Sequence, residues 1–150
     1  MIHKFAVMKR YVILALLQLF ACNLLAQNNS VLANGDWYRI TTNKNGIYKL
    51  EYSDLKALGV AVSNLENSSI KIYGNGGGML PHLNSEFRHD DLTQIAIEIY
   101  DYNNNGIFEN GDYILFYGES ANEWNFNENN GYFEHQVHFF SDEVKYYLTI

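Results

Sequence analysis

The stretch Asp101-Tyr-Asn-Asn-Asn-Gly-Ile-Phe-Glu-Asn-Gly-Asp-Tyr-Ile-Leu-Phe-Tyr-Gly118 joins a polar loop directly to a run typical of a β-strand. The first twelve residues carry side-chain oxygens at loop positions 1, 3, 5, 9 and 12, with glycine at position 6. This spacing is typical of a loop that folds around Ca²⁺, in which position 7 contributes its backbone carbonyl and glycine allows the sharp turn. In an EF-hand a helix would follow, whereas here a strand follows. We therefore expect a calcium loop between two strands.

The pattern assigns six residues to the calcium site, five through their side chains and one through its backbone carbonyl: Asp101, Asn103, Asn105, Glu109, Asp112 and, by its carbonyl, Ile107. The alternative is an ordinary Asn-Gly turn, because Asn and Gly dominate turns for backbone reasons. Asp112 is also shorter than the bidentate Glu that is usual at position 12. Three carboxylates in one short loop would nevertheless repel one another without a cation. The sequence thus predicts a weak site, with a Kd of about 10⁻⁴ to 10⁻³ M, as in extracellular modules.

The rest of the chain repeats strand patterns separated by turn signals. Runs rich in aromatic and β-branched residues predict seven strands, at 36–42, 46–50, 69–73, 92–100, 113–117, 132–140 and 145–149. The turn signal Asn43–Gly46 predicts a hairpin between the first two strands. Ser53 is predicted to cap a short helix over 54–58 that ends at Gly59. Residues 122–131 are predicted to be an exposed loop. Together these elements predict an all-β fold, an antiparallel β-sandwich of about seven strands with one short helix.

Aromatic residues are abundant, with 12 Tyr, 9 Phe and 2 Trp. Those in the predicted strands are expected to fill the core of the sandwich: Tyr113, Phe116, Tyr117, Phe133, Phe139, Phe140, Tyr146 and Tyr147. The alternative is a sugar-binding face, which would need adjacent coplanar rings left in solvent.

The first 26 residues have the pattern of a signal peptide. Three basic residues precede an apolar run over 11–21, which has the length of a signal-peptide core and is short for a membrane span. A cut after Ala26 would leave a chain that begins at Gln27. The alternative is a lipoprotein signal, in which Cys22 of a lipobox-like sequence would carry the lipid. Both alternatives predict export.

Charge and cysteine content limit what the remaining 124 or so residues can do. Cys22 is the single cysteine, so a chain cut after Ala26 has no disulfide and no cysteine nucleophile. Residues 1–26 contain three of the ten basic residues and none of the seventeen acidic ones, which leaves a net charge of 7 − 17 = −10. Such a charge repels nucleic acid and suits a protein that binds cations. We expect one exported domain over 27–150 that binds no nucleic acid.

Several short motifs along this domain resemble the N-terminal region of the PorU family, the sortases of the Bacteroidetes type IX secretion system. They follow one another in the family's order: Gly35-Asp-Trp-Tyr-Arg-Ile40, Asn45-Gly-Ile-Tyr-Lys-Leu50, Asp54-Leu-Lys-Ala-Leu-Gly59, Ile72-Tyr-Gly-Asn-Gly-Gly-Gly-Met-Leu-Pro81, Asp90-Asp-Leu92, Gly111-Asp-Tyr-Ile-Leu-Phe-Tyr-Gly118 and Tyr146-Tyr-Leu-Thr149. The motif that ends at Pro81 is the most specific. The resemblance covers about residues 35–149.

The resemblance implies a gingipain-type cysteine peptidase domain further along a longer parent chain. In the family this domain removes C-terminal signals from secreted cargo and can pass the acyl group to a lipopolysaccharide amine. Its catalytic His and Cys would lie beyond Ile150, so no catalytic residue is assigned here and the chain alone should be inactive. The strand pattern up to Ile150 lacks a closing turn, which also leads us to expect a longer parent chain.

The implied partners are the downstream peptidase domain, other type IX secretion components and secreted cargo proteins. The implied location is the outer membrane or cell surface of a Gram-negative bacterium. A different class of function is also compatible with the residues: a free-standing secreted module for calcium-dependent adhesion or carbohydrate binding.

Overall fold

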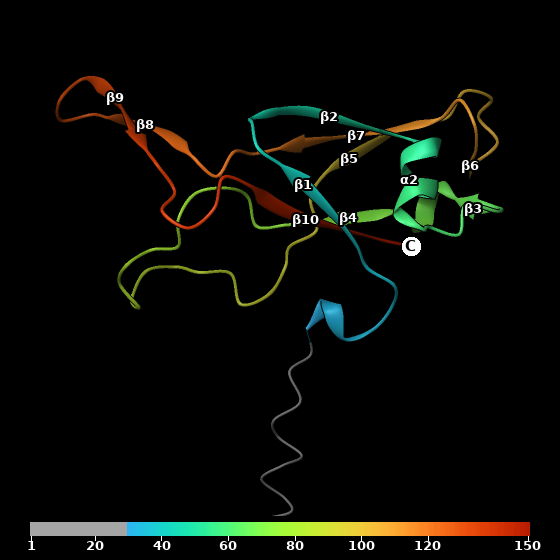
Figure 1. Ribbon diagram of the computed structural model, residues 1–150, viewed down its shortest axis with the longest axis horizontal. Coiled ribbons are helices and arrows are strands. Elements are labelled where there is room, and N and C mark those ends of the chain that lie inside the picture. Colours follow the sequence, from blue (N-terminus) through green and yellow to red (C-terminus); the bar gives the residue numbers. More distant parts are fainter. Residues whose placement is uncertain (1–29) are drawn as a thin grey trace, which may run out of the picture. The chain divides into compact units, whose positions relative to one another are not determined.

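The computed structural model describes residues 30–150, so the predicted signal peptide and Cys22 lie outside the described residues. The strands are β1 (Tyr38–Thr42), β2 (Gly46–Glu51), β3 (Leu65–Glu66), β4 (Lys71–Tyr73), β5 (Ile97–Tyr100), β6 (Ile107–Phe108), β7 (Tyr113–Gly118), β8 (Glu123–Asn127), β9 (Tyr132–Gln136) and β10 (Val144–Thr149). The helix α2 spans Tyr52–Leu58, and the 3₁₀ turns η1 and η2 span Val31–Ala33 and Asn67–Ser69. Figure 1 shows these elements along the chain.

Two three-stranded antiparallel sheets form the framework, with strand orders β1-β10-β4 and β2-β7-β5. The first lies below the second in Figure 1. Along β10 the buried residues are Val144, Tyr146 and Leu148, and β7 alternates in the same way, so one face of each strand is buried. The buried side chains of both sheets belong to one hydrophobic core. The predicted all-β antiparallel sandwich is confirmed.

The strand predicted at 92–100 is present in part, and its alternate residues face the core. Ile95, Ile97 and Ile99 pack against the core, although β5 begins only at Ile97. Before that point the chain is tied to β4 by single contacts, including the Ile95 N–H to the Ile72 carbonyl at 2.9 Å.

Strands β1 and β2 lie in different sheets, so the predicted hairpin between them is wrong. β1 pairs with β10 and β2 pairs with β7, and the intervening turn carries the chain from one sheet to the other. Tyr48 fixes this crossing, because its hydroxyl donates to the Lys44 carbonyl at 3.0 Å and accepts the Lys44 N–H at 3.3 Å. The turn predicted at 43–46 is present, but the strands that pair on either side of it are determined by segments far away in the sequence.

The helix α2 starts one residue before the predicted cap. Glu51 is the N-cap in place of Ser53, and the Asp54 carboxylate accepts the Glu51 N–H at 2.8 Å. The cap therefore comes from a carboxylate inside the first turn, which also suits the helix dipole. Gly59 ends the helix as predicted, in a left-handed conformation with φ of 91°.

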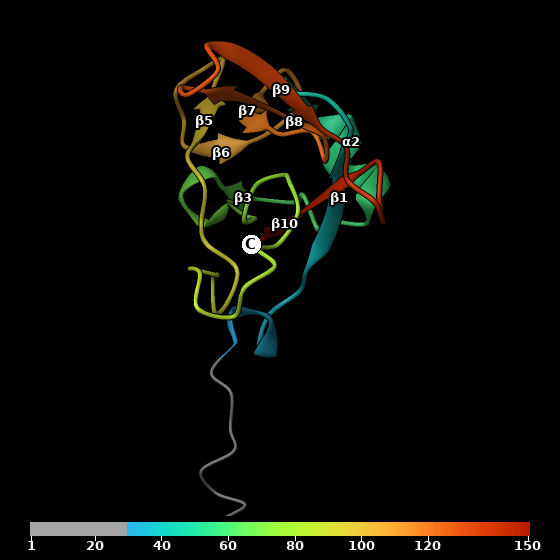
Figure 2. The ribbon, with the colours of Figure 1, turned by 90° about the vertical axis from the view of Figure 1, so that its left-hand side faces the viewer.

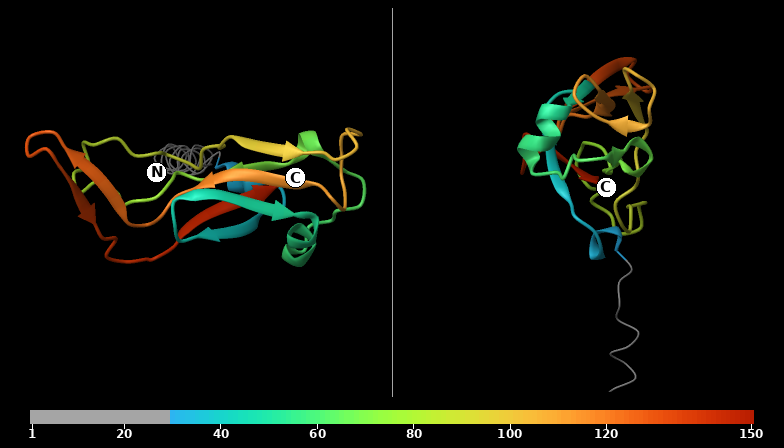
Figure 3. Two further views of the ribbon diagram at one scale, coloured as in Figure 1. Left: turned by 90° about the horizontal axis from the view of Figure 1, so that it is seen from above. Right: turned by 90° about the vertical axis from the view of Figure 1, so that its right-hand side faces the viewer.

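Residues 122–131 are not a loop but most of a β-hairpin, so that prediction is wrong. β8 pairs with β9 in antiparallel register, and Gly131, with φ of 71°, closes the turn by donating to the Asn127 carbonyl at 2.8 Å. The many Asn and Glu residues correctly indicate exposure, but the backbone is extended. Figure 1 and the left view of Figure 3 show that this hairpin projects beyond the two main sheets, and in Figure 2 it faces the viewer.

The base of this hairpin, residues 119–121, is held from three sides. The Thr42 hydroxyl donates to the Glu119 carbonyl at 2.7 Å, and the Glu119 carboxylate accepts the Gly77 N–H at 2.6 Å. A Cβ at Gly77 would lie 2.0 Å from the Ser120 carbonyl oxygen. The glycine run 74–78 therefore lets two backbone segments of this domain approach closely.

Tyr146 connects the two sheets. Its side chain, on β10, is 1% exposed, and its ring meets that of Phe116 on β7 edge to face at 5.5 Å. The Tyr146 hydroxyl accepts the Glu119 N–H at 3.0 Å, so the ring also secures the base of the hairpin. Burial raises the pKa of Tyr146, which keeps the phenol protonated at neutral pH.

Replacing Gly74 by Ala tests this packing. The new Cβ would lie 2.4 Å from Cδ1 of Tyr146, a buried ring that has no room to move. We expect Gly74→Ala to lower the free energy of unfolding by about 1–3 kcal/mol, as overpacking usually does. Urea unfolding followed by circular dichroism measures the change.

Gly46→Ala is the matched control, because a Cβ there meets nothing within 4 Å. We expect it to leave the free energy of unfolding unchanged or slightly higher. Equal stability of the two variants would contradict the packing described for Tyr146.

Candidate functional site

The predicted calcium loop lies between β5 and β7, and the short strand β6 interrupts it. β6 pairs with β3, and Phe108 on β6 is fully buried, so the middle of the loop is anchored to the core. Figure 1 shows the loop at the end of the molecule opposite the β8–β9 hairpin.

Asp101 organises the first half of the loop. One carboxylate oxygen accepts the Gly106 N–H at 2.8 Å, and the other accepts the Asn105 N–H at 3.3 Å. Gly106 has φ of 79°, so glycine supplies the sharp turn that the sequence pattern predicts.

Three more of the predicted ligands meet within the loop. The side-chain amides of Asn103 and Asn105 both donate to one oxygen of Glu109, the second at 3.2 Å. The Asn103 side-chain oxygen accepts the Asn105 N–H at 3.2 Å, and that of Asn105 accepts the Ile107 N–H at 2.7 Å. The structure therefore brings Asp101 and these three side chains to one side of a tight turn.

Asp112 plays a different part. It is 2% exposed, and its two oxygens accept the N–H groups of Tyr102 at 2.9 Å and Glu109 at 2.8 Å. The side chain thus closes the loop, with both oxygens engaged by the backbone. Over residues 30–150, no three His, Cys, Asp or Glu side chains form a group that could hold a metal ion. Calcium binding stays a prediction, in which the Asn oxygens and the Ile107 carbonyl would supply neutral ligands.

Asn67, on η2, is a loop neighbour that the sequence analysis missed. Its amide donates to the Asp101 carboxylate at 2.9 Å, and its backbone N–H donates to the Gly106 carbonyl at 2.9 Å. Its side-chain oxygen is shielded from solvent and has no hydrogen-bond partner. An amide oxygen next to a carboxylate is the kind of ligand that Ca²⁺ takes. No local pattern connects Asn67 with a loop 34 residues further on.

The electrostatics of Asp101 follow from these contacts. Partial desolvation opposes ionisation, but hydrogen bonds from the backbone between Asn103 and Gly106 outweigh it. The pKa of Asp101 is therefore held below its usual range.

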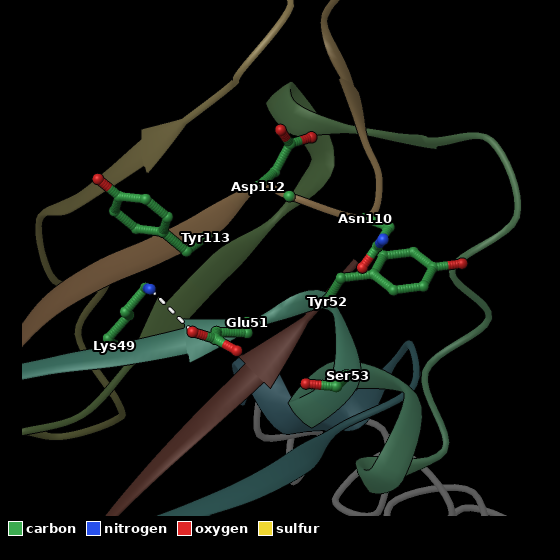
Figure 4. Close-up of a pocket in the computed structure, with 8 residues that line it drawn as sticks. Lys49, Glu51, Tyr52, Ser53, Asn110, Asp112 and Tyr113 are labelled. Carbon is green, nitrogen blue, oxygen red and sulfur yellow. Dashed lines mark hydrogen bonds and ion pairs between the residues drawn. The ribbon is translucent and has the colours of Figure 1, made fainter.

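A shallow polar pocket adjoins the end of the loop, as Figure 4 shows. The Lys49 ammonium forms a 2.8 Å ion pair with Glu51 and lies 4.4 Å from the centre of the Tyr113 ring. The hydrogen bond to Glu51 raises the pKa of Lys49, so this amine stays protonated and is unsuited to act as a base or nucleophile. Neither His nor Cys is among the residues that line the pocket.

The aromatic residues divide between core and surface. Phe116 and Tyr146 are buried and Tyr113 and Tyr147 half-buried, as expected. The core assignment is wrong for the other four, which are exposed: Tyr117, Phe133, Phe139 and Phe140. The last three belong to the β8–β9 hairpin or the segment after it, where no second sheet covers them.

These observations define the chain as an antiparallel β-sandwich module with a polar turn loop at one end and an aromatic hairpin at the other. Among solved structures it is similar to dimeric latent PorU from Porphyromonas gingivalis, with 27% sequence identity and a TM-score of 0.61. The match covers 80% of this chain and 10% of that chain, so this chain spans about a tenth of the solved protein. The similarity supports a PorU-like fold.

No protein-family model matches the chain, and neither does any curated protein. Within residues 30–150, no helix has both the length and the apolar character needed to cross a membrane.

Calcium titration tests the loop. With a Kd of about 10⁻⁴ to 10⁻³ M, Ca²⁺ at ten times its Kd would stabilise the fold by about 1.4 kcal/mol. We expect Tm to rise by roughly 5 °C for a domain of this size, as measured by differential scanning calorimetry.

Asp101→Asn and Glu109→Gln should abolish this rise, since each removes a predicted anionic ligand. Glu134→Gln, on the distant hairpin, is the matched control and should retain it. A wild-type Tm that stays constant up to 10 mM Ca²⁺, or rises equally with Mg²⁺, would reject the calcium assignment.

The lowered pKa of Asp101 predicts a pH dependence. The unfolded carboxyl titrates near its reference value of about 3.9, and the folded one titrates lower, so its contribution to stability is complete above that value. It is lost as pH falls through the folded pKa. We expect the stability difference between wild type and Asp101→Asn to be constant from pH 7 to 5 and to shrink below pH 4. Urea unfolding at each pH measures this difference, and a difference independent of pH down to 2 would contradict it.

Proposed function

We propose that this chain forms the N-terminal, non-catalytic β-domain of a PorU-like sortase of the type IX secretion system. The observation that carries the proposal is the similarity to latent PorU, which extends over 80% of this chain at 27% identity. The motifs that resemble the family lie along the same framework, from β1 through β7 to β10.

The domain would support or orient a gingipain-type cysteine peptidase domain further along the parent chain. That domain would supply the catalytic His and Cys, remove C-terminal signals from secreted cargo and pass the acyl group to a lipopolysaccharide amine. The parent protein would work at the outer membrane or cell surface, with other type IX secretion components as partners.

A second candidate is a free-standing module for calcium-dependent adhesion or carbohydrate binding. The exposed aromatic side chains of the β8–β9 hairpin favour a binding role of some kind. The reading frame beyond codon 150 separates the two candidates. A gingipain-type His and Cys downstream selects the sortase, and a stop codon selects the free module.

Deleting codons 35–149 in the producing bacterium tests the proposed function. We expect secreted cargo to keep its C-terminal signal, because the peptidase domain would lose its support. Mass spectrometry of cargo C-termini measures the uncleaved fraction, and immunoblotting checks that the shortened protein reaches the surface. Normal cargo processing by the shortened protein would contradict the proposal.

The purified 150-residue chain provides a second arm of the test. It should leave peptides that contain a cargo cleavage site intact over hours. Robust cleavage by this chain alone would show that the catalytic groups lie within it.

A further inference from the structure

One face of the β8–β9 hairpin is formed largely by aromatic rings. In the strand register Trp124 lies opposite His135 and Phe126 opposite Phe133, so these four side chains share one side of the two-stranded sheet. We call them the aromatic face. Trp124, Phe126 and Phe133 are 63%, 55% and 63% exposed.

Such a hairpin is costly to leave uncovered. Every residue of β9 is exposed, and β8 and β9 pair with no other strand of the described chain. Isolated two-stranded hairpins are marginally stable in water, and contiguous exposed apolar patches usually mark interaction sites. The base of the hairpin, by contrast, is hydrogen-bonded to Thr42, Gly77 and Tyr146. The aromatic face is therefore anchored to the two main sheets.

The charged residues of the hairpin itself are all acidic. No Lys or Arg occurs between Arg88 and Lys145, whereas Glu123 and Glu134 lie on the opposite side of the hairpin and Glu128 in its turn. The negative field of these carboxylates attracts cations.

We propose that the aromatic face binds an extended polypeptide segment of a partner protein in which Lys or Arg alternates with apolar residues. The apolar side chains would cover the aromatic face. The alternating basic groups, which point to the other side of an extended segment, would meet Glu123 and Glu134 on the opposite side of the hairpin. The unpaired edges of β8 and β9 provide backbone groups for strand addition. This inference stands on the hairpin alone and does not rest on the proposed function.

Two other occupants fit the geometry less well. Trp124 and His135 stack on each other, with ring centres 4.5 Å apart and planes 27° apart, so they cover each other's faces. Phe126 and Phe133 are tilted by 58°, so the rings do not form the coplanar platform that a sugar needs. A second copy of the chain would bring two acidic hairpins together, which like-charge repulsion disfavours.

Peptide binding to the full chain tests the inference. The probe is a twelve-residue peptide in which Lys and Arg alternate with Val and Leu, titrated by isothermal calorimetry. One control peptide has Glu in place of the basic residues, and another keeps the basic residues but has Ser in place of the apolar ones. We expect saturable binding of the probe alone, weakened at least fivefold when NaCl is raised from 50 to 500 mM.

Two sets of variants locate the site. Phe126→Thr with Phe133→Thr should weaken binding at least tenfold, because the apolar contact is lost while strand propensity is kept. Glu128→Gln with Glu134→Gln leaves the aromatic face unchanged and should weaken binding about threefold or more. Tyr102→Ser removes an exposed aromatic side chain at the opposite end of the domain and should bind like wild type. Circular dichroism checks each fold, and the Glu pair keeps the test valid if the Phe pair unfolds.

Several results would overturn the inference. Equal affinity for the acidic peptide, or unchanged binding in both double variants, would exclude the aromatic face. Binding of cellohexaose or chitohexaose that depends on Phe126 and Phe133, without peptide binding, would identify a sugar site. A dimer in sedimentation velocity that the Phe double variant abolishes would identify a second copy as the occupant.

Discussion

The packing of Tyr146 between the two sheets is the contact on which the rest of the domain depends. Its ring joins β10 to Phe116 on β7, and its hydroxyl secures the backbone at Glu119. A chain of this size has a modest core, so one large buried side chain that touches both sheets and a loop contributes to several elements at once. Gly74 is required beside the ring because any Cβ there would occupy the same space.

The same contact separates a rigid region from an exposed one. Glu119 is hydrogen-bonded through its backbone to Thr42 and Tyr146 and through its carboxylate to Gly77. The β8–β9 hairpin that follows pairs only with itself among the described elements. At the opposite end, β6 and Phe108 anchor the polar loop in a comparable way. Both candidate binding regions are thus exposed segments that are anchored to well-packed parts of the domain. Binding residues commonly lie on loops that a rigid scaffold positions.

The sequence was informative wherever a residue pattern is local. The residue patterns of 92–100, 113–117 and 145–149 predicted the strands β5, β7 and β10, and the spacing of Asp101, Asn103 and Asn105 predicted a turn that gathers them. Prediction from the sequence failed where the structure depends on which β-strands pair. The turn before Gly46 gives no sign that β1 prefers β10, and the Asn-rich composition of β8 conceals an extended strand. Asn67 and the burial of Asp112 depend on contacts between segments far apart in sequence, which no single-sequence pattern encodes.

The position of β10 has a consequence for how this domain acquires its structure. β10 is the central strand of its sheet, with β1 and β4 on either side. Both flanking strands therefore lack their partner until residues 144–149 have been synthesised, and this sheet can assemble only then. Folding that waits for such long-range contacts is slow and leaves edges exposed meanwhile. A nascent chain that has not yet reached β10 cannot form this sheet, so the core between the two sheets closes only after β10 has been added.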